Sequence, residues 1–176
     1  LLPGLVGMGI IATSVWGIAF SIVQARMRKL LKRMVASPMR RSHYLLAQLL
    51  ARMLFLLPEV AIPLLFGHYV IGMPMHGSIA ALAFVSVAGA LSTGGIGLLA
   101  ASRAKTFEAI SGMVNLIMLP MWIASGVFFS ASRFPAAVQP FVQALPLTAL
   151  VDSLRAVILE GASLASIGGE LAILAA

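Results

Sequence analysis

The amino-acid sequence predicts an all-α fold, that of a polytopic helical membrane protein. Of its 176 residues, 61% are hydrophobic and only 10% are charged, whereas soluble domains have roughly 45–50% apolar and about 25% charged residues. The apolar residues gather in stretches of about 20 residues, the length that a helix needs to cross a hydrocarbon core of about 30 Å. A strongly basic segment separates the first two stretches. A soluble fold could not bury this much apolar surface.

We expect five membrane spans within one transmembrane domain that covers residues 1–176. The first span ends at the basic segment, and the second contains Pro58 and Pro63. The turn-rich segment 72–77 joins the second span to the third. The predicted spans are residues 4–23, 45–70, 78–101, 109–129 and 162–176.

The third predicted span carries small residues at helical spacing. Because lipid supplies no hydrophobic force between helices, membrane helices associate through close packing, which small side chains allow. We therefore expect this stripe to pack closely on a neighbouring helix. Its residues are Ser86, Ala90, Gly94, Gly97 and Ala101.

The predicted cytoplasmic region 26–44 begins with the pattern of a basic amphipathic helix over residues 26–36. Its apolar residues recur at i, i+3, i+4, i+7 and i+8. Ser37 and Pro38 then read as an N-cap followed by proline at the first helical position, which starts a new helix. The basic helix either docks on a partner protein or lies on anionic lipid, which attracts each basic residue by about 1 kcal/mol. The apolar residues are Met27, Leu30, Leu31, Met34 and Val35, and the opposite face carries Arg28, Lys29, Lys32 and Arg33.

The distribution of charge predicts the orientation of the chain. Between Arg26 and Arg41 there are seven Lys or Arg residues and no acidic residue, and short loops with such an excess stay in the cytoplasm. Arg103 and Lys105 then fall on the same side. The region 130–160 falls on the outer side.

A helix is predicted over residues 146–160 of this outer region. At about 15 residues it is too short to span the bilayer, so we expect an interfacial or re-entrant helix. Asp152 and Arg155 lie three residues apart on its polar side. They suit either an ion pair within the helix or contact with the headgroup of a substrate.

Three polar residues stand out within the predicted spans. Glu59 costs about 2.5 kcal/mol or more at membrane depth and needs a partner. It either lines a substrate path or subunit interface, or stays protonated near the outer edge. Arg52 lies seven residues earlier, about 10 Å along the same face, so we expect a bridge through a second subunit or water rather than direct contact. Asn115 either hydrogen-bonds to a neighbouring helix or contacts substrate.

Several other kinds of site are excluded by the residue types and their spacing. The chain has no cysteine, so it forms no disulfide and no Cys-ligated metal site. His43, His68 and His76 lack the spacing of a metal site. The net charge of +7 is concentrated in one loop without interleaved aromatic residues, which argues against nucleic-acid binding. The glycines before Lys105 and Thr106 lack the spacing of a phosphate-binding loop, and we expect no enzyme activity in this chain.

Three segments, in their order and on their predicted sides, resemble the membrane subunits of type 2 ATP-binding-cassette (ABC) exporters. The first is the basic segment with its step at Ser37 and Pro38. The second is the aromatic, proline-punctuated segment 126–135, and the third is 145–155, which leads to Gly161. Each segment alone is not specific to this family, but together the three segments cover nearly the whole chain.

This resemblance implies a permease with six spans, the first upstream of Leu1 and the last running beyond Ala176. The basic helix would be a coupling helix that docks on a partner ATPase, either a separate subunit or a fused domain. That ATPase would bind ATP and Mg²⁺, and this chain would bind no cofactor and no metal. A second permease copy would complete a dimer, in the bacterial inner membrane, that exports an amphipathic lipid, drug or polysaccharide. The residues implied in coupling are Arg26, Met27, Arg28, Leu30, Leu31, Arg33, Met34, Ser37 and Pro38.

Two alternatives from other classes remain. An ion-coupled secondary transporter needs ionisable groups within the membrane, for which Glu59 is a lone candidate, and no internal repeat is visible. A structural membrane subunit without a transport activity of its own needs no such group.

Overall fold

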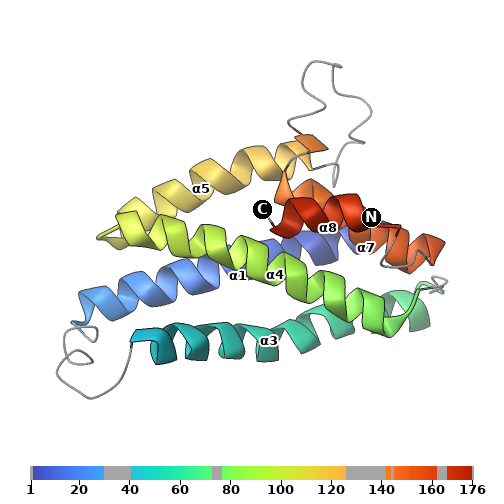
Figure 1. Ribbon diagram of the computed structural model, residues 1–176, viewed down its shortest axis with the longest axis horizontal. Helices are drawn as coiled ribbons and strands as arrows, with labels where there is room; N and C mark the ends of the chain where they lie inside the picture. Colours follow the sequence, from blue (N-terminus) through green and yellow to red (C-terminus); the bar gives the residue numbers. More distant parts are fainter. Residues whose placement is uncertain are drawn as a thin grey trace.

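The computed structural model describes residues 2–29, 41–72, 77–125, 142–143, 145–161 and 166–175. Within these residues every regular element is a helix, which confirms the predicted all-α class. The long helices run in alternating directions (Figure 1), so the end of α1, the start of α3 and the α4–α5 corner lie at one end of the bundle. The helices are α1 (Leu2–Met27), α3 (Arg41–Tyr69), α4 (Ile79–Arg103), α5 (Phe107–Ala124), α7 (Pro146–Glu160) and α8 (Gly168–Ala175).

Three of these helices are long and apolar enough to cross a membrane: α1, α3 from Ser42 onward, and α4. Pro58 and Pro63 both lie inside α3. Helix α5 is shorter, with 18 residues, and α8 has 8 residues. The remainder of the predicted fourth span, residues 126–129, and the start of the predicted fifth, residues 162–165, lie outside the described part of the chain.

Local sequence signals account for several helix ends. The hydroxyls of Ser78 and Thr106 accept hydrogen bonds from backbone N–H groups in the first turns of α4 and α5, at 3.2 and 3.3 Å, as N-cap residues do. Helix α7 begins with Pro146, which needs no hydrogen-bond partner for its nitrogen there. It ends at Gly161, whose φ of 65° is left-handed and suits glycine. Helix α7 therefore has the limits that the sequence predicts.

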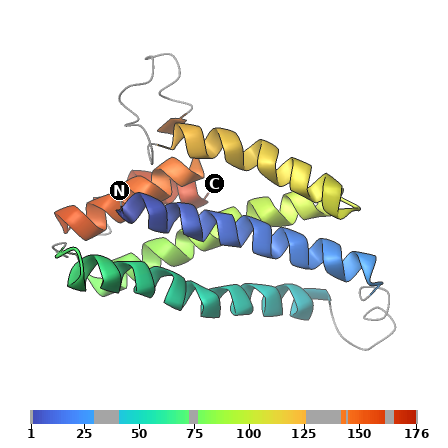
Figure 2. The same ribbon diagram turned by 180° about the vertical axis from the view of Figure 1, so that it is seen from behind.

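Helix α1 lies in the middle of the bundle, with α3 on one side and α5 on the other (Figure 2), and packs closely on α4. All five residues of the predicted small-residue stripe on α4 are buried. A Cβ atom on Gly97 would lie 2.8 Å from the carbonyl oxygen of Val15, and one on Gly94 would lie 2.9 Å from Ile18 Cδ1. The close approach of helices that the stripe predicts is therefore confirmed.

Helix α7 packs against α1, α4 and α8 at the end of the bundle where α1 begins (Figure 1). A Cβ atom on Gly89 would lie 2.5 Å from Leu150 Cδ1, so the glycine of α4 gives the Leu150 side chain of α7 the space it occupies. This burial favours a re-entrant helix over one that lies on the membrane surface. The larger apolar residues of α7 that are buried are Leu147, Leu150, Val151, Leu154, Val157 and Ile158.

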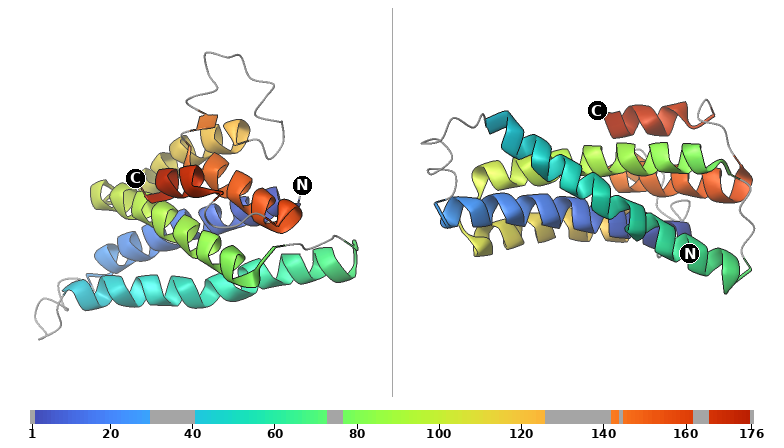
Figure 3. Two further views of the ribbon diagram at one scale, coloured as in Figure 1. Left: turned by 45° about the vertical axis from the view of Figure 1, so that its right-hand side comes forward. Right: turned by 90° about the horizontal axis from the view of Figure 1, so that it is seen from below.

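Helix α3 forms one edge of the bundle and crosses α1 obliquely (Figure 3). In its most apolar stretch only 22% of the residues are buried, against 56% for α1 and 44% for α4. Between Leu46 and Phe66 every exposed side chain of this helix is apolar. The large exposed side chains include Leu46, Leu50, Leu54, Phe55, Leu57, Ile62, Leu65 and Phe66.

Candidate functional site

The predicted basic helix over residues 26–36 is wrong at its start. Helix α1 continues through Arg26 to Met27, and a turn follows at Arg28 and Lys29. Lys29 has a φ of 56°, and a residue in this left-handed region cannot continue a right-handed helix. The predicted helix therefore does not run unbroken from Arg26 through Lys29. The other predicted coupling residues, Leu30, Leu31, Arg33, Met34, Ser37 and Pro38, lie outside the described residues.

The side chain of Arg26 is engaged within the chain. Its Nη1 donates a hydrogen bond of 2.5 Å to the carbonyl oxygen of Ala104, the residue that caps the C-terminal end of α4. The last carbonyls of a helix lack partners within the helix and carry partial negative charge, so a guanidinium is favourable there. Met27 and Arg28 are exposed. Arg26 thus links the start of the basic segment to the α4–α5 corner, a contact between residues 78 positions apart.

Arg26→Gln is expected to loosen this corner by about 1 kcal/mol, because the shorter neutral amide loses both the charge and the reach to Ala104. The Ala104 N–H bonds to the Ala100 carbonyl oxygen at 3.2 Å, and its hydrogen exchange should become faster. Hydrogen–deuterium exchange of the peptide that covers residues 100–106 measures this effect. Arg28→Gln, which removes an exposed charge, is the matched control. Equal exchange in both variants contradicts the assigned role of Arg26.

Arg52 and Glu59 contact each other directly, which contradicts the expectation that water or a second subunit bridges them. Arg52 Nη1 lies 2.7 Å from Glu59 Oε2. Seven residues are about two helical turns, so both side chains share one face of α3. The long side chain of Arg52 extends forward, and the side chain of Glu59 leans back toward the N-terminus of the helix, as helical side chains do. The two side chains together span the distance of about 10 Å between these positions on the helix, which appears too long for direct contact when only the sequence spacing is considered.

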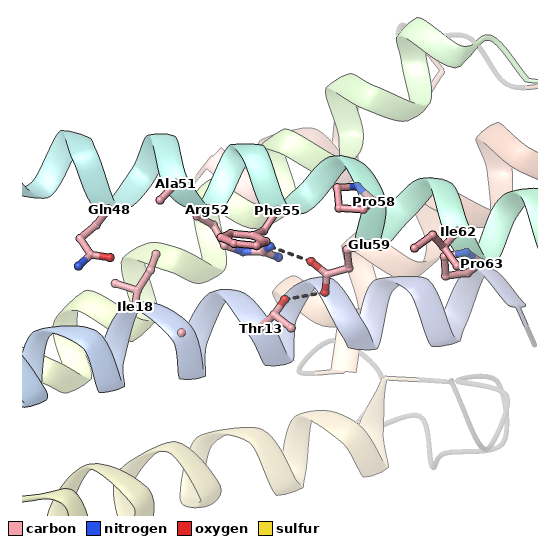
Figure 4. A pocket seen from close by; sticks show the side chains of 11 residues that line it. Thr13, Ile18, Gln48, Ala51, Arg52, Phe55, Pro58, Glu59, Ile62 and Pro63 are labelled. Atoms are coloured by element: carbon pink, nitrogen blue, oxygen red, sulfur yellow. Dashed lines mark hydrogen bonds and ion pairs between the residues drawn. The ribbon is translucent and has the colours of Figure 1, made fainter.

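The pair is completed by three residues of α1. Arg52 Nε donates to Ser14 Oγ at 2.8 Å, and its Nη2 donates to the Ile10 carbonyl oxygen at 3.1 Å. Thr13 Oγ1 donates to Glu59 Oε1 at 2.6 Å (Figure 4). Arg52 is 7% exposed and Glu59 19%. The charges are therefore paired and hydrogen-bonded, which is what makes their presence within an apolar helix bundle acceptable.

A groove of about 660 Å³ lies between α1 and α3 beside this pair (Figure 4). Glu59 lines the groove, as one of its predicted roles requires, but each of its oxygens already accepts a hydrogen bond. The groove also shows that apolar packing between α1 and α3 is incomplete on this side. It is lined by Thr13, Gly17, Ile18, Gln48, Ala51, Arg52, Phe55, Pro58, Glu59, Ile62 and Pro63.

Asn115 lies on the exposed face of α5, together with Leu116 and Leu119. Gly112, one turn earlier, has open space around the position of a Cβ atom. A carboxamide that is uncovered in the middle of an apolar helix is unfavourable in lipid and stable when a polar group from another helix reaches it. This face of α5 is therefore suited to contact with another protein segment or with a polar ligand group.

Asp152 and Arg155 form an ion pair within α7, with Arg155 Nη1 at 3.5 Å from Asp152 Oδ1 and both side chains nearly half exposed. Partial burial raises the pKa of Asp152; Arg155 counteracts this rise, and Glu170 on α8 adds to it. The pair joins no two helices. The structure thus has the simpler of the two predicted arrangements, an ion pair three residues apart along one helix.

Comparison with known proteins identifies the sequence family of this chain. Residues 1–159 match the family described as ABC-2 type transporter. The chain is 28% identical over 164 residues to a protein of Escherichia coli K12 described as probable multidrug ABC transporter permease YbhS, and equally to its counterpart in E. coli O157:H7. The match covers 92% of this chain and 43% of the relative, so the chain spans less than half the length of these curated relatives. No solved structure matches the chain significantly. The family match extends over most of the sequence, and the chain belongs to the ABC-2 type transporter family.

Proposed function

We propose that this chain is the membrane-embedded part of an ABC exporter permease, driven by ATP hydrolysis on a partner ATPase. The observation that carries the proposal is the position of the basic residues. Arg26, Arg28 and Lys29 at the end of α1 lie at the same end of the bundle as Arg103 and Lys105 at the α4–α5 corner. By the positive-inside rule this end faces the cytoplasm, where an ATPase can reach it.

The ATPase, as a separate subunit or a fused domain, binds ATP and Mg²⁺ and presses on the segment between α1 and α3. Arg26 passes this movement to the α4–α5 corner through its bond to Ala104. The helices then rearrange so that an amphipathic substrate leaves on the outer side. The multidrug description of the E. coli relatives supports a drug among the proposed substrate classes, beside lipids and polysaccharides. The site of action is the inner membrane of a bacterium.

A second permease copy completes the transporter in this proposal. The exposed carboxamide of Asn115, with the open Gly112 beside it, supports contact of α5 with the second copy or with substrate held between the copies. Small residues let two helix backbones approach, and an Asn side chain can hydrogen-bond across the contact. Between Leu46 and Phe66 the exposed side chains of α3 are all apolar, which suits contact with lipid.

The state of Glu59 supports an ABC permease over an ion-coupled secondary transporter. A coupling carboxylate must gain and lose a proton or cation during transport. Glu59 instead accepts hydrogen bonds from Arg52 and Thr13 at 2.7 and 2.6 Å. Both of its carboxylate oxygens therefore already have a donor within this chain.

Replacing Leu30 and Leu31 together by Ser tests the proposed coupling. These changes preserve every charge but remove the apolar stripe that docks on the ATPase, so transport driven by ATP should be lost while insertion and topology survive. Lys32→Gln, opposite the apolar stripe in the sequence pattern and outside the residues implied in coupling, is the control and should retain most of the activity. Normal transport by a correctly inserted Leu30→Ser, Leu31→Ser variant counts against coupling through this segment.

Affinity purification of the full-length parent protein tests the partner. Mass spectrometry should find a stoichiometric ATPase subunit in the gently solubilised complex, or a nucleotide-binding domain in the parent chain itself. Purification without any ATPase contradicts the exporter proposal. Transport that collapses with the proton gradient while ATP is plentiful would instead support the secondary transporter.

A further inference from the structure

Helix α3 is attached to the bundle less extensively than the other long helices. Its outer face is exposed, and the groove beside Glu59 interrupts its packing on α1. Apolar contacts between membrane helices are also weakly directional, because every face of such a helix is apolar. The position of α3 relative to α1 must therefore depend strongly on any polar contact between the two helices.

The cluster around Arg52 is such a contact. It contains four hydrogen bonds, of which three join α3 to α1: Arg52 to Ser14, Arg52 to the Ile10 carbonyl, and Thr13 to Glu59. The fourth, between Arg52 and Glu59, holds the guanidinium in position. Hydrogen bonds in such surroundings meet little competition from water, and their angles fix both the rotation and the axial position of the helices.

The location of this cluster determines how α1 and α3 respond to a force on the basic segment. Helices α1 and α3 are the two helices on either side of the basic segment, so a force on that segment acts on both. Arg52 lies about 16 Å along α3 from its start at Arg41, near the middle of the helix. Two helices joined only at one end can separate under such a force, whereas two helices that are also joined at mid-length move together.

We propose that Arg52 and Glu59, with Thr13 and Ser14, form an interhelical tie that makes α1 and α3 move as one body during transport. Arg52 and Glu59 are positioning residues in this role. The inference rests on the proposed function, because it takes the basic segment as the point where force enters. It also explains why an ion pair stands here, since apolar residues of similar size can match such a pair in stability but not in directional geometry.

Distance measurements in the full-length transporter test the tie directly. Spin labels on Cys substituted for Gln24 of α1 and Leu46 of α3 sit on exposed positions of the two helices, and this chain has no native cysteine to interfere. A second label pair, Gln24 with Leu116 of α5, reports movement between α1 and another helix. In the wild-type protein the Gln24–Leu46 distance should be the same with and without bound ATP, whereas the Gln24–Leu116 distance should change.

The variant that carries Arg52→Met and Glu59→Met together should behave differently while remaining folded. Its Gln24–Leu46 distances should spread and shift when ATP binds. The amount of substrate moved per ATP hydrolysed should fall about tenfold, a change of the size that typical coupling free energies between two sites produce. Asp152→Asn is the matched control, because it breaks an ion pair within a single helix. It should leave both readouts at the wild-type level.

Two results overturn the tie: a change of the Gln24–Leu46 distance in the wild-type protein on ATP binding, or wild-type coupling in the folded double variant. If no ATPase associates with the parent protein, the proposed function fails, yet the tie is still testable. Without nucleotide, the Gln24–Leu46 distance distribution should be wider in the double variant than in the wild type. Equal widths then refute the tie independently of the transport mechanism.

Discussion

Arg52→Met alone is expected to lower the free energy of unfolding by about 3–5 kcal/mol, the cost of leaving one buried charge without its partner. Glu59 then keeps only the hydrogen bond from Thr13, and Ser14 Oγ and the Ile10 carbonyl lose their donor. The double variant with Glu59→Met should recover most of this loss, because two flexible apolar side chains fill the space without a charge. Thermal unfolding of the purified protein in detergent, followed over the four members of the double-mutant cycle, measures both effects.

The sign of the interaction energy in this cycle is the decisive quantity. If Arg52 stabilises α3 through Glu59, the double variant must be more stable than the sum of the two single losses predicts. Asp152→Asn, which removes one partner of a half-exposed pair, should change stability by less than about 1 kcal/mol. Strict additivity of Arg52→Met and Glu59→Met would show that the two residues act independently.

Gly97→Ala is expected to destabilise the contact between α1 and α4 by about 1–3 kcal/mol, the usual cost of overpacking. The added Cβ atom would lie 2.8 Å from the Val15 carbonyl oxygen and 3.1 Å from Val15 Cα. Both are backbone atoms, so no rotamer change can relieve the clash and the helices must move apart. Thermal unfolding in detergent measures the loss, and a fall in the yield of folded protein should accompany it.

Gly95→Ala is the matched control for this prediction. Gly95 lies on the same helix two residues earlier, and a Cβ atom there would meet no atom within 4 Å. Because alanine has the higher helix propensity, this variant should be as stable as the wild type or slightly more stable. Equal losses at both positions would mean that the loss at Gly97 does not come from close packing against Val15.

The extent of the helices could be predicted from the sequence because the signals for it are local. Hydrophobic length sets the spans, and residues such as Ser78, Thr106, Pro146 and Gly161 mark helix ends. Helix α7 has the predicted limits for this reason. The small-residue stripe of α4 was equally readable, since Gly97 and its neighbours fall on one face. The end of α1 before Lys29 could not be predicted in this way, because no glycine or proline marks it.

The partners of Arg52 were missed, although a signal for them exists. Thr13 and Ser14 are polar residues in the middle of α1, and Arg52 is at a similar distance from the connecting segment on α3. In an antiparallel helix pair these positions lie at matching depth. The matching depth of these polar residues indicates that α1 and α3 contact each other there. It does not indicate the geometry of the contact, which depends on the rotation of each helix.

The sequence by itself determined that this protein is a helical membrane protein, which end of the bundle carries the basic residues, and that the chain resembles ABC exporter permeases. Only the tertiary structure decided that Arg52 contacts Glu59, the Ser14 side chain and the Ile10 carbonyl of α1, that Arg26 caps α4, and that the apolar face of α7 is buried. The physical reason is the composition of membrane helices. A helix that is apolar on every side has no amphipathic stripe to indicate which face meets a neighbour, so its rotation and crossing follow from packing and a few polar contacts.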